Sequence, residues 1–201
     1  MESLLEKIRP AALYITHGDS STGSVQKIEG LGALCHKEVM KNRNFKPPFY
    51  LDIELLAAQW NCFGNTRQYH HTLSPPLLWA LRSCLKEISK ETLPKVWARH
   101  ARNTAHFYKR IEELSLEFLI PNSEERLVTV TTVVLPKDYD YVEFVHYMRN
   151  KHNILISLGV GPTAGKAVRI GIMGFNSTIQ VADAIADAMA DTLIALKKSL
   201  P

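Results

Sequence analysis

The sequence contains no long hydrophobic run, because no apolar stretch approaches the roughly 18 residues that a membrane-spanning helix needs. Its opening, MESLLEKIRP, mixes acidic and basic side chains and holds no apolar stretch of signal-peptide length. An excess of one charge is also missing, since the net charge is +4 and the lysines and arginines are dispersed. We therefore expect neither a membrane nor a nucleic-acid partner, and we do not expect a secreted protein.

Cysteine is scarce as well. The three cysteines, Cys35, Cys62 and Cys84, are far apart and form no CxxC pair, so neither a zinc site nor a disulfide framework is expected. Reduced thiols in an intracellular compartment are the simplest interpretation. No GxSxG motif is present, which argues against a serine hydrolase of the nucleophile-elbow type. The 201 residues are enough for one medium domain, or for a domain with a fragment of another.

The N-terminal part resembles half of a strand–helix–strand unit. Residues 11–16, AALYIT, are apolar and end at His17-Gly18, as a buried strand of a parallel sheet does. The loop GDSSTGS and a helical pattern at 25–37 follow. No returning strand comes next, because the chain continues as EVMKNRNFKPPFY. Such a unit cannot cover its own apolar surface, so we expect residues 1–48 to pack poorly.

From residue 51 onward the pattern predicts an α+β sandwich. Two more helices are expected to begin at Asp140 and Ser177, each followed three positions later by a Glu or Gln. We expect an antiparallel or mixed sheet of about four strands covered by helices, with a compact unit from about residue 92. The other expected helices cover 51–60, 77–88 and 96–114, and the expected strands cover 116–120, 127–135, 154–157 and 167–172.

Three segments could carry chemistry, and the first is THGDSSTG at 16–23. It follows a predicted strand, and open α/β sheets bind ligands beyond the carboxyl ends of their strands. Small hydroxyl side chains and free backbone N–H groups suit an anion such as phosphate. A plain polar turn is the alternative.

The second segment is GVGPTAGK at 159–166, followed by RIG. It is not a P-loop, because Val160 stands where that motif needs glycine and Ala167 where it needs Ser or Thr. Arg169 lies within the predicted strand 167–172, and an arginine there could clamp a carboxylate with two parallel hydrogen bonds. A surface arginine on the solvated face of the sheet is the alternative.

The third segment is Tyr69-His70-His71-Thr72. Adjacent histidines seldom converge on one metal ion, and no third ligand stands at a useful spacing. We therefore expect no metal site here, and we favour polar contacts within the loop.

Six stretches occur in an order that is more specific than any one of them. They are THGDSSTG, IEGLGALCH, FYLDI, the W-x-C of Trp60 and Cys62, RQYHHT and GVGPTAGKAVRIGIMG. This ordered set resembles the alanine–glyoxylate (serine–pyruvate) aminotransferase family, and the related 3-hydroxykynurenine transaminases share it. From Phe49 to Lys198 the match is continuous.

The resemblance implies the α/β fold of fold type I, a homodimer and pyridoxal 5'-phosphate as the cofactor. It implies transfer of an amino group from alanine or serine to glyoxylate or pyruvate. By position, Ser20 resembles a residue that contacts the cofactor, and Tyr69 and Thr72 resemble residues that reach the phosphate of the partner subunit's cofactor. Arg169 resembles the clamp for the substrate carboxylate. Lys166 has a counterpart in the family but is not its Schiff-base residue.

The chain departs from the family between Lys37 and Phe45. There the family has a strand with the Asp that pairs with the pyridine nitrogen, then a Ser-Gly-x-Gln-Lys turn with the Schiff-base lysine, and neither occurs in this sequence. The family's N-terminal part is also missing. We therefore expect no catalytic lysine and no activity of this chain alone. Lys41 or Lys46 could substitute only from a charged, proline-ended connector, which offers no desolvated site.

Two interpretations stay open: an aminotransferase whose sequence has lost a segment, or a short non-catalytic chain that acts as a dimerisation or binding partner. In either case we expect residues 1–48 to be a remnant of the large cofactor-binding domain. Residues 49–91 would form an interdomain loop and helix, and 92–201 the α+β small domain. The resemblance implies a peroxisome, although the ending Lys-Ser-Leu-Pro holds no intact peroxisomal tripeptide. The cytoplasm and the mitochondrion are the alternatives.

Overall fold

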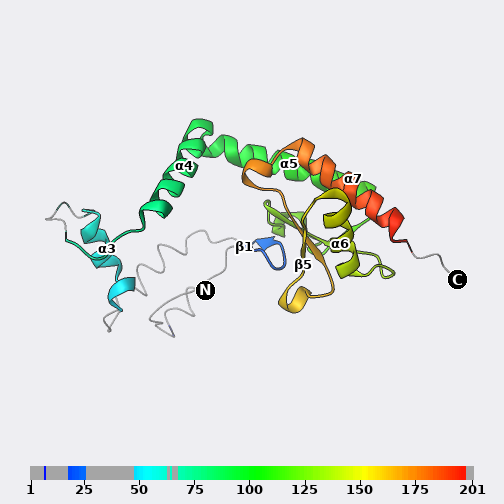
Figure 1. Cartoon of the computed structure of the whole chain (residues 1–201), viewed down its shortest axis with the longest axis horizontal. Helices are drawn as coiled ribbons and strands as arrows, with labels where there is room; N and C mark the ends of the chain where they lie inside the picture. Colours follow the sequence, from blue (N-terminus) through cyan, green and yellow to red (C-terminus); the bar gives the residue numbers. More distant parts are fainter. Residues whose placement is uncertain (1–6, 8–17, 26–47, 63, 65–67, 198–201) are drawn as a thin grey trace. The chain divides into compact units, whose positions relative to one another are not determined.

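The computed structural model describes residues 7, 18–25, 48–62, 64 and 68–197 of the chain. The expected strand 11–16 and nearly all of the expected helix 25–37 lie outside these residues. The chain divides into two units, Met1–Ile15 with Ile28–Lys90 and Thr16–Lys27 with Glu91–Pro201, and each is described by itself. Figure 1 labels their elements along the chain.

The first unit is helical in its described part. A short 3₁₀ helix η2 (Phe49–Leu51) leads to α3 (Ile53–Gln59), and α4 (Pro75–Glu91) follows after an irregular stretch. These elements confirm the helices expected at 51–60 and 77–88, with boundaries shifted by a few residues. Pro75 and Pro76 open α4, where the missing N–H of proline costs no helical hydrogen bond.

The second unit contains a four-stranded antiparallel sheet. The strands are β3 (Glu117–Phe118), β4 (Val130–Val134), β5 (Ser157–Leu158) and β6 (Val168–Gly171), and their order in the sheet is β3-β4-β6-β5. The expected sheet of about four strands is confirmed. The strand expected at 154–157 instead begins at Ser157, where pairing with Arg169 of β6 starts.

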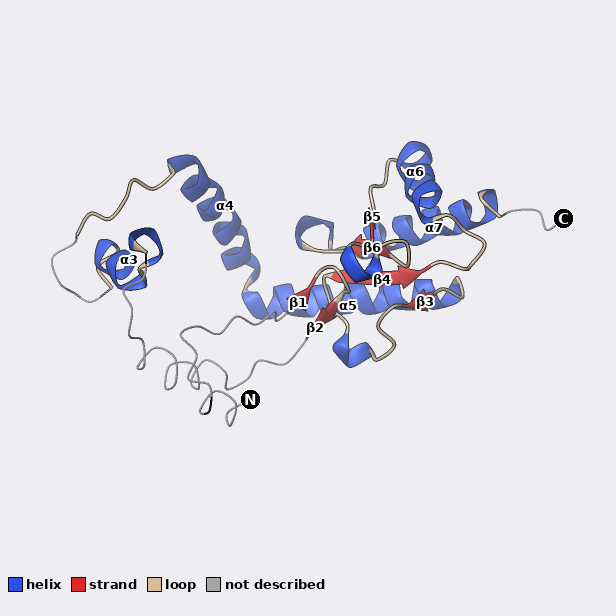
Figure 2. Ribbon diagram, turned by 90° about the horizontal axis from the view of Figure 1, so that it is seen from below, coloured by secondary structure: helices blue, strands red, loops and turns tan. Residues whose placement is uncertain are grey.

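Three long helices complete this unit: α5 (Leu93–Glu113), α6 (Tyr141–His152) and α7 (Ile179–Ala195). Helix α7 packs against both α5 and α6, and Figure 2 shows these helices around the sheet. Short 3₁₀ turns connect the elements at η3 (Ser123–Glu125), η4 (Gly161–Thr163) and η5 (Gly174–Asn176).

The helix caps show one success and one error of the sequence pattern. Asp140 caps α6 as expected, with its carboxylate accepting the N–H of Glu143 at 2.8 Å. The cap of α7 is Thr178 rather than Ser177, because the Thr178 hydroxyl accepts the N–H of Val181 at 3.2 Å. Ser177 is completely buried, and its carbonyl accepts hydrogen bonds from Arg99 and Asn103.

The segment expected to be a loop and the start of a helix is a β-hairpin, β1 (Gly18–Asp19) with β2 (Ser24–Val25). The expected helical start at Val25 is therefore wrong. The Asp19 carboxylate accepts the N–H of Ser21 and the hydroxyl of Thr22, which closes the turn. Gly23 completes it with a φ of +75°.

The apolar core lies entirely in the second unit. Every buried apolar side chain in the described part of the chain falls between Phe107 and Met189. In the first unit, by contrast, no residue of α4 is buried. The core therefore belongs to the unit that joins Thr16–Lys27 with Glu91–Pro201.

Acidic side chains of α7 bind α5 at the edge of this core. Asp183 accepts hydrogen bonds from His106 at 2.7 Å and from Arg110 at 2.6 Å, and Arg110 also reaches Asp187 at 2.7 Å. The hydrogen bonds from His106 and Arg110 hold the pKa of the Asp183 carboxyl below its usual value.

The buried core predicts that shortening one of its side chains destabilises the chain far more than shortening an exposed side chain. Phe107→Ala removes a fully buried ring and should destabilise the chain by about 3–5 kcal/mol. Phe175→Ala is the matched control, because Phe175 is 98% exposed; its effect should stay within about 0.5 kcal/mol. Urea unfolding of both variants measures the difference, and equal losses would contradict the described core.

The lowered pKa of Asp183 predicts a pH-dependent effect. A carboxyl whose folded pKa lies below its unfolded value contributes stability above the unfolded value, and this is lost as the pH falls through the folded value. Asp183→Asn should therefore be less stable than the parent at neutral pH, and the gap should close below about pH 3.8. Asp138→Asn changes an exposed carboxylate and serves as the control. A gap that persists unchanged in acid would show that the carboxylate's charge is not what matters.

Candidate functional site

The alternation of side chains along β6 determines where Arg169 lies. Val168 and Ile170 are 0% and 1% exposed and belong to the core, so Arg169 between them points to the opposite face of the sheet. Thr132 of β4 is its register partner and lies on the same face. The guanidinium therefore lies on the face of the sheet that does not contact the core.

The hairpin at 18–25 lies against this face. A Cβ on Gly23 would stand 2.3 Å from the Thr132 hydroxyl oxygen, so only glycine allows the turn to approach β4. The N–H of Leu127 donates to the Gly23 carbonyl at 2.6 Å, and Ser24 forms an isolated β-bridge with Arg126.

Arg169 joins the hairpin to the sheet. Its Nη1 donates to the Ser20 carbonyl at 3.1 Å, and its Nε donates to the Leu158 carbonyl at 2.9 Å. Its Nη2 makes no hydrogen bond to any residue that the structure describes, which leaves a donor for a ligand carboxylate. Two of the residues proposed from the sequence, Ser20 and Arg169, are therefore in contact, although the contact uses the backbone of Ser20.

A second contact connects the hairpin segment with the loop at 159–166. The Thr163 hydroxyl lies 3.2 Å from the Ser21 carbonyl and accepts the N–H of Val160 at 3.0 Å. A Cβ on Gly159 would stand 2.1 Å from the Thr163 carbonyl, so this loop also needs its glycine. Segments about 140 positions apart in the sequence thus meet on one side of the sheet.

Some of the hydroxyl and backbone N–H donors that were expected to be free in the hairpin loop are already hydrogen-bonded. The Asp19 carboxylate occupies the N–H of Ser21 at 2.9 Å and the hydroxyl of Thr22 at 2.7 Å. These bonds hold the pKa of Asp19 below its usual value, so the loop carries its own anion. These two donors are therefore occupied within the loop, as in the alternative of a polar turn, while the side chain of Ser20 remains exposed.

The remaining two residues proposed from the sequence, Tyr69 and Thr72, lie in the first unit and also touch each other. The Tyr69 Oη and Thr72 Oγ1 atoms are 2.7 Å apart, and both side chains are exposed. The polar contacts expected around them occur, because His70 lies 2.7 Å from the Phe49 carbonyl through Nε2. Among the described residues no cluster of His, Cys, Asp and Glu could hold a metal ion.

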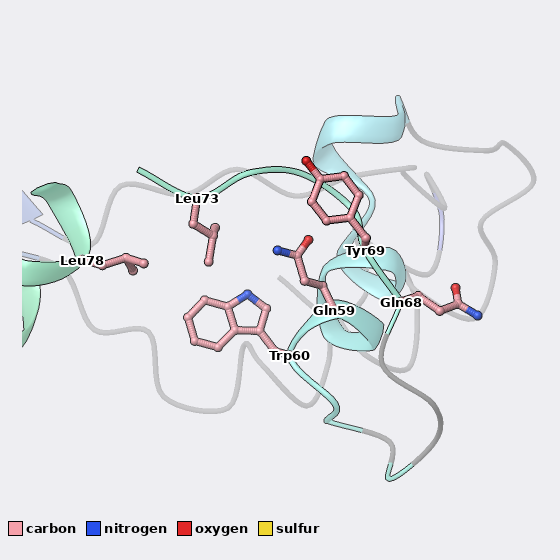
Figure 3. Close-up of a pocket in the computed structure, with 6 residues that line it drawn as sticks. All are labelled: Gln59, Trp60, Gln68, Tyr69, Leu73 and Leu78. Carbon is pink, nitrogen blue, oxygen red and sulfur yellow. The ribbon is translucent and has the colours of Figure 1, made fainter. Parts of the chain in front are cut away.

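A hollow of about 540 Å³ adjoins this loop (Figure 3). Gln59 is one of the lining residues that sequence reasoning missed, and its carboxamide bonds the backbone of the loop. No motif marks a glutamine at the end of a short helix, so only the fold reveals this contact. The hollow is lined by Gln59, Trp60, Gln68, Tyr69, Leu73 and Leu78.

Every lysine that the structure describes is exposed. An amine that forms an imine with a carbonyl cofactor needs a fixed and partly desolvated site. The described lysines offer no such enclosure, and Lys41 and Lys46 lie outside the described residues. The exposed lysines are Lys7, Lys86, Lys90, Lys95, Lys109, Lys137, Lys151, Lys166 and Lys197.

No family model matches the chain, but individual proteins do. The alanine–glyoxylate aminotransferase of Rattus norvegicus is 34% identical, over 96% of this chain and 59% of the rat protein. The solved alanine–glyoxylate aminotransferase of Nostoc sp. is 30% identical with a TM-score of 0.81, over 96% of this chain and 64% of that one. The chain belongs to the alanine–glyoxylate aminotransferase family.

This membership confirms the resemblance and the expected fold type I architecture. A ureidoglycine–glyoxylate aminotransferase of Bacillus subtilis, 19% identical, shares the fold with a TM-score of 0.83 over 100% of this chain and 64% of that one. The family is enzymatic, and pyridoxal phosphate is implied by it. No helix in the described part of this aminotransferase-family chain is long and apolar enough to cross a membrane.

The chain spans 59% of the rat relative's length. The alignment itself covers 246 positions against the 201 residues of this chain, so at least 45 aligned positions of the relative have no residue here. Because an alignment ends on matched residues, these gaps lie inside the matched stretch.

The residues present fit the polar ends of the family's cofactor and substrate. Paired exposed hydroxyls on Tyr69 and Thr72 are suitable donors for a phosphate, and the Nη2 of Arg169 is suitable for a carboxylate. An enclosed lysine that would anchor the cofactor is missing from the described residues. The fit therefore covers binding groups and leaves out the covalent anchor.

The contacts of Arg169 predict that it holds the hairpin on the sheet. Arg169→Lys removes the forked donor that bonds Ser20 and Leu158 together. Hydrogen exchange at the Gly23 and Leu127 amides should then be about fivefold faster, since each lost hydrogen bond contributes on the order of 1 kcal/mol. Arg102→Lys alters an exposed arginine of α5 and should leave these amides unchanged. Unaltered exchange in Arg169→Lys would refute the role of the guanidinium.

Proposed function

We propose that this chain represents an aminotransferase that transfers the amino group of alanine or serine to glyoxylate or pyruvate, and that it is inactive alone. The observation that carries the second part is the internal gap of at least 45 positions in the alignment of 246 positions with the 201-residue chain. The motif order supports a gap between Lys37 and Phe45, where the family resemblance gives relatives the cofactor-binding lysine. The exposure of every described lysine supports the same conclusion.

The binding roles follow from the groups left free. Arg169 keeps Nη2 for the carboxylate of the amino acid or the 2-oxo acid, while its other nitrogens hold the sheet and the hairpin. Ser20 offers an exposed hydroxyl at the tip of that hairpin for the cofactor. Both residues belong to the second unit, Arg169 on β6 and Ser20 in the turn that Asp19 closes.

Tyr69 and Thr72 are assigned to the cofactor phosphate of the partner subunit in a homodimer. In a pair of hydroxyls 2.7 Å apart, one donates to the other, and the second keeps its proton for a phosphate oxygen. When bound, pyridoxal phosphate would supply the carbonyl that accepts the amino group and the ring that stabilises the carbanion. The side chains named above would bind and orient, and the described lysines, which are all exposed, offer no enclosed amine to move a proton at the substrate carbon.

The domain assignment is part of the proposal. Residues 1–48 correspond to a remnant of the large domain, 49–91 to an interdomain loop and helix, and 92–201 to the small domain. The concentration of the core in the second unit supports the last assignment. A peroxisomal location, with roles in glyoxylate removal and glycine formation, is supported by the family resemblance alone.

Reductive trapping tests the proposal. The purified chain is mixed with pyridoxal phosphate, reduced with borohydride and mapped by peptide mass spectrometry. We expect scattered, substoichiometric labelling of lysines, and no turnover of alanine and glyoxylate. The rat relative, treated in the same way, is the positive control and should give one stoichiometric adduct.

Two results would overturn the proposal. A stoichiometric adduct at a single lysine, Lys41 or Lys46 included, would show that this chain holds its own anchor. Turnover of alanine and glyoxylate by the chain alone would show that no missing segment is needed. A genomic segment encoding Ser-Gly-x-Gln-Lys between the codons of Lys37 and Phe45 would support the lost segment directly.

A further inference from the structure

The contact between Tyr69 and Thr72 requires a bent backbone. Residues three apart in an extended chain have Cα atoms about 10 Å apart and side chains on opposite sides. The two hydroxyl oxygens nevertheless lie 2.7 Å from each other. The chain must therefore turn at the two residues between them, His70 and His71.

One side chain bonds the backbone at this turn. The N–H groups of His70 and His71 both donate to Oε1 of Gln59, each at 2.9 Å. Successive N–H groups of an extended strand point to opposite sides, so two that converge on one oxygen mark a concave turn. The Nε2 of Gln59 completes the set by donating to the His71 carbonyl at 2.9 Å.

The imidazole of His70 holds the same turn from its other side. It is 6% exposed, stacks on Phe49 at 4.2 Å and lies 2.7 Å from the Phe49 carbonyl through Nε2. A carbonyl only accepts, so Nε2 carries the proton, and Nδ1 of a neutral His70 accepts from Nδ1 of His71 at 2.7 Å. The histidines thus contact each other and the Phe49 turn, which explains their adjacency without a metal.

We propose that Gln59 is a positioning residue for the hydroxyl pair of Tyr69 and Thr72. Its carboxamide makes three hydrogen bonds to His70 and His71, and these keep the bend that brings the two hydroxyls together. Gln59 is the last residue of α3, so these hydrogen bonds connect the end of the helix to the loop. The assignment rests on the proposed function, in which this pair binds the cofactor phosphate.

Two substitutions at position 59 separate the parts of the carboxamide. Gln59→Leu keeps a similar size and removes all three hydrogen bonds. Gln59→Glu keeps acceptors for the two N–H groups and turns an oxygen toward the His71 carbonyl, so it should have an intermediate effect. Gln68→Leu is the matched control, because Gln68 lines the same hollow and its side chain makes no hydrogen bond to any described residue.

The first measurement is nuclear magnetic resonance on the full chain without ligand. In the parent we expect a cross-relaxation peak between the Tyr69 ring and the Thr72 methyl group, and slow amide exchange at His70 and His71. Gln59→Leu should abolish the peak and speed the exchange about tenfold, Gln59→Glu should fall between, and Gln68→Leu should match the parent. An unchanged peak and unchanged exchange in Gln59→Leu would overturn the positioning role.

The second measurement is calorimetric titration with pyridoxal phosphate, which separates this inference from the proposed function. If both are correct, Gln59→Leu should weaken binding about as much as Tyr69→Phe combined with Thr72→Val, and Gln68→Leu should not. Binding that is insensitive to the Tyr69 and Thr72 variants, or absent in the parent, would remove the phosphate role from the proposed function. The ligand-free measurement would then still decide whether Gln59 holds the loop. Weak binding by the hydroxyl variants with full binding by Gln59→Leu would overturn the inference alone.

Discussion

The two-faced sheet of the second unit is the constraint on which the candidate site depends. Each strand presents alternate residues to opposite sides, so β6 can bury Val168 and Ile170 only if Arg169 points away from the core. A one-residue slip of β6 against β4 would bury a guanidinium and expose two apolar side chains. The burial of the core therefore maintains the orientation of Arg169. Arg169 in turn positions the hairpin through its hydrogen bond to the Ser20 carbonyl.

The two units differ in how far their apolar side chains are buried. The second unit buries its aromatic and aliphatic side chains, Phe107, Phe144 and Met148 among them, to 0% exposure. In the first unit, Leu77, Leu81 and Leu85 recur at helical spacing along α4 and are 51–71% exposed. A stripe of this kind normally packs against another element, and relatives contain at least 45 aligned positions that this 201-residue chain lacks.

Local patterns predicted the fold well where one interaction dominated. The run of β-branched residues at 127–135 located β4, and three-to-four spacing located α5 and α7, because burial acts on every residue of each pattern. The hairpin at 18–25 was missed, because the bonds of Asp19 within the turn and the fit of Gly23 over Thr132 outweigh helical spacing at Val25. The cap of α7 is Thr178 and not Ser177, because side chains of α5 bind the Ser177 carbonyl in the interior. The residues next to Ser177 in the sequence give no sign of these contacts.

The sequence suggested some residues of the candidate site and not others. Resemblance marked Ser20, Tyr69, Thr72 and Arg169 by position, but it could not supply Gln59, whose role arises from contacts 11 and 12 positions away.

Under the proposed function, the groups that bind and the group that reacts lie in different parts of the family's chain, and the reason is topological. Arg169 and the hydroxyls of Tyr69 and Thr72 are positioned by local elements, β6 in one unit and the end of α3 in the other, so each can persist when a distant segment is lost. A cofactor-binding lysine depends instead on desolvation, which needs polypeptide on several sides at once. Under the proposed function, loss of one internal segment would therefore remove the anchor and leave the proposed recognition groups in place.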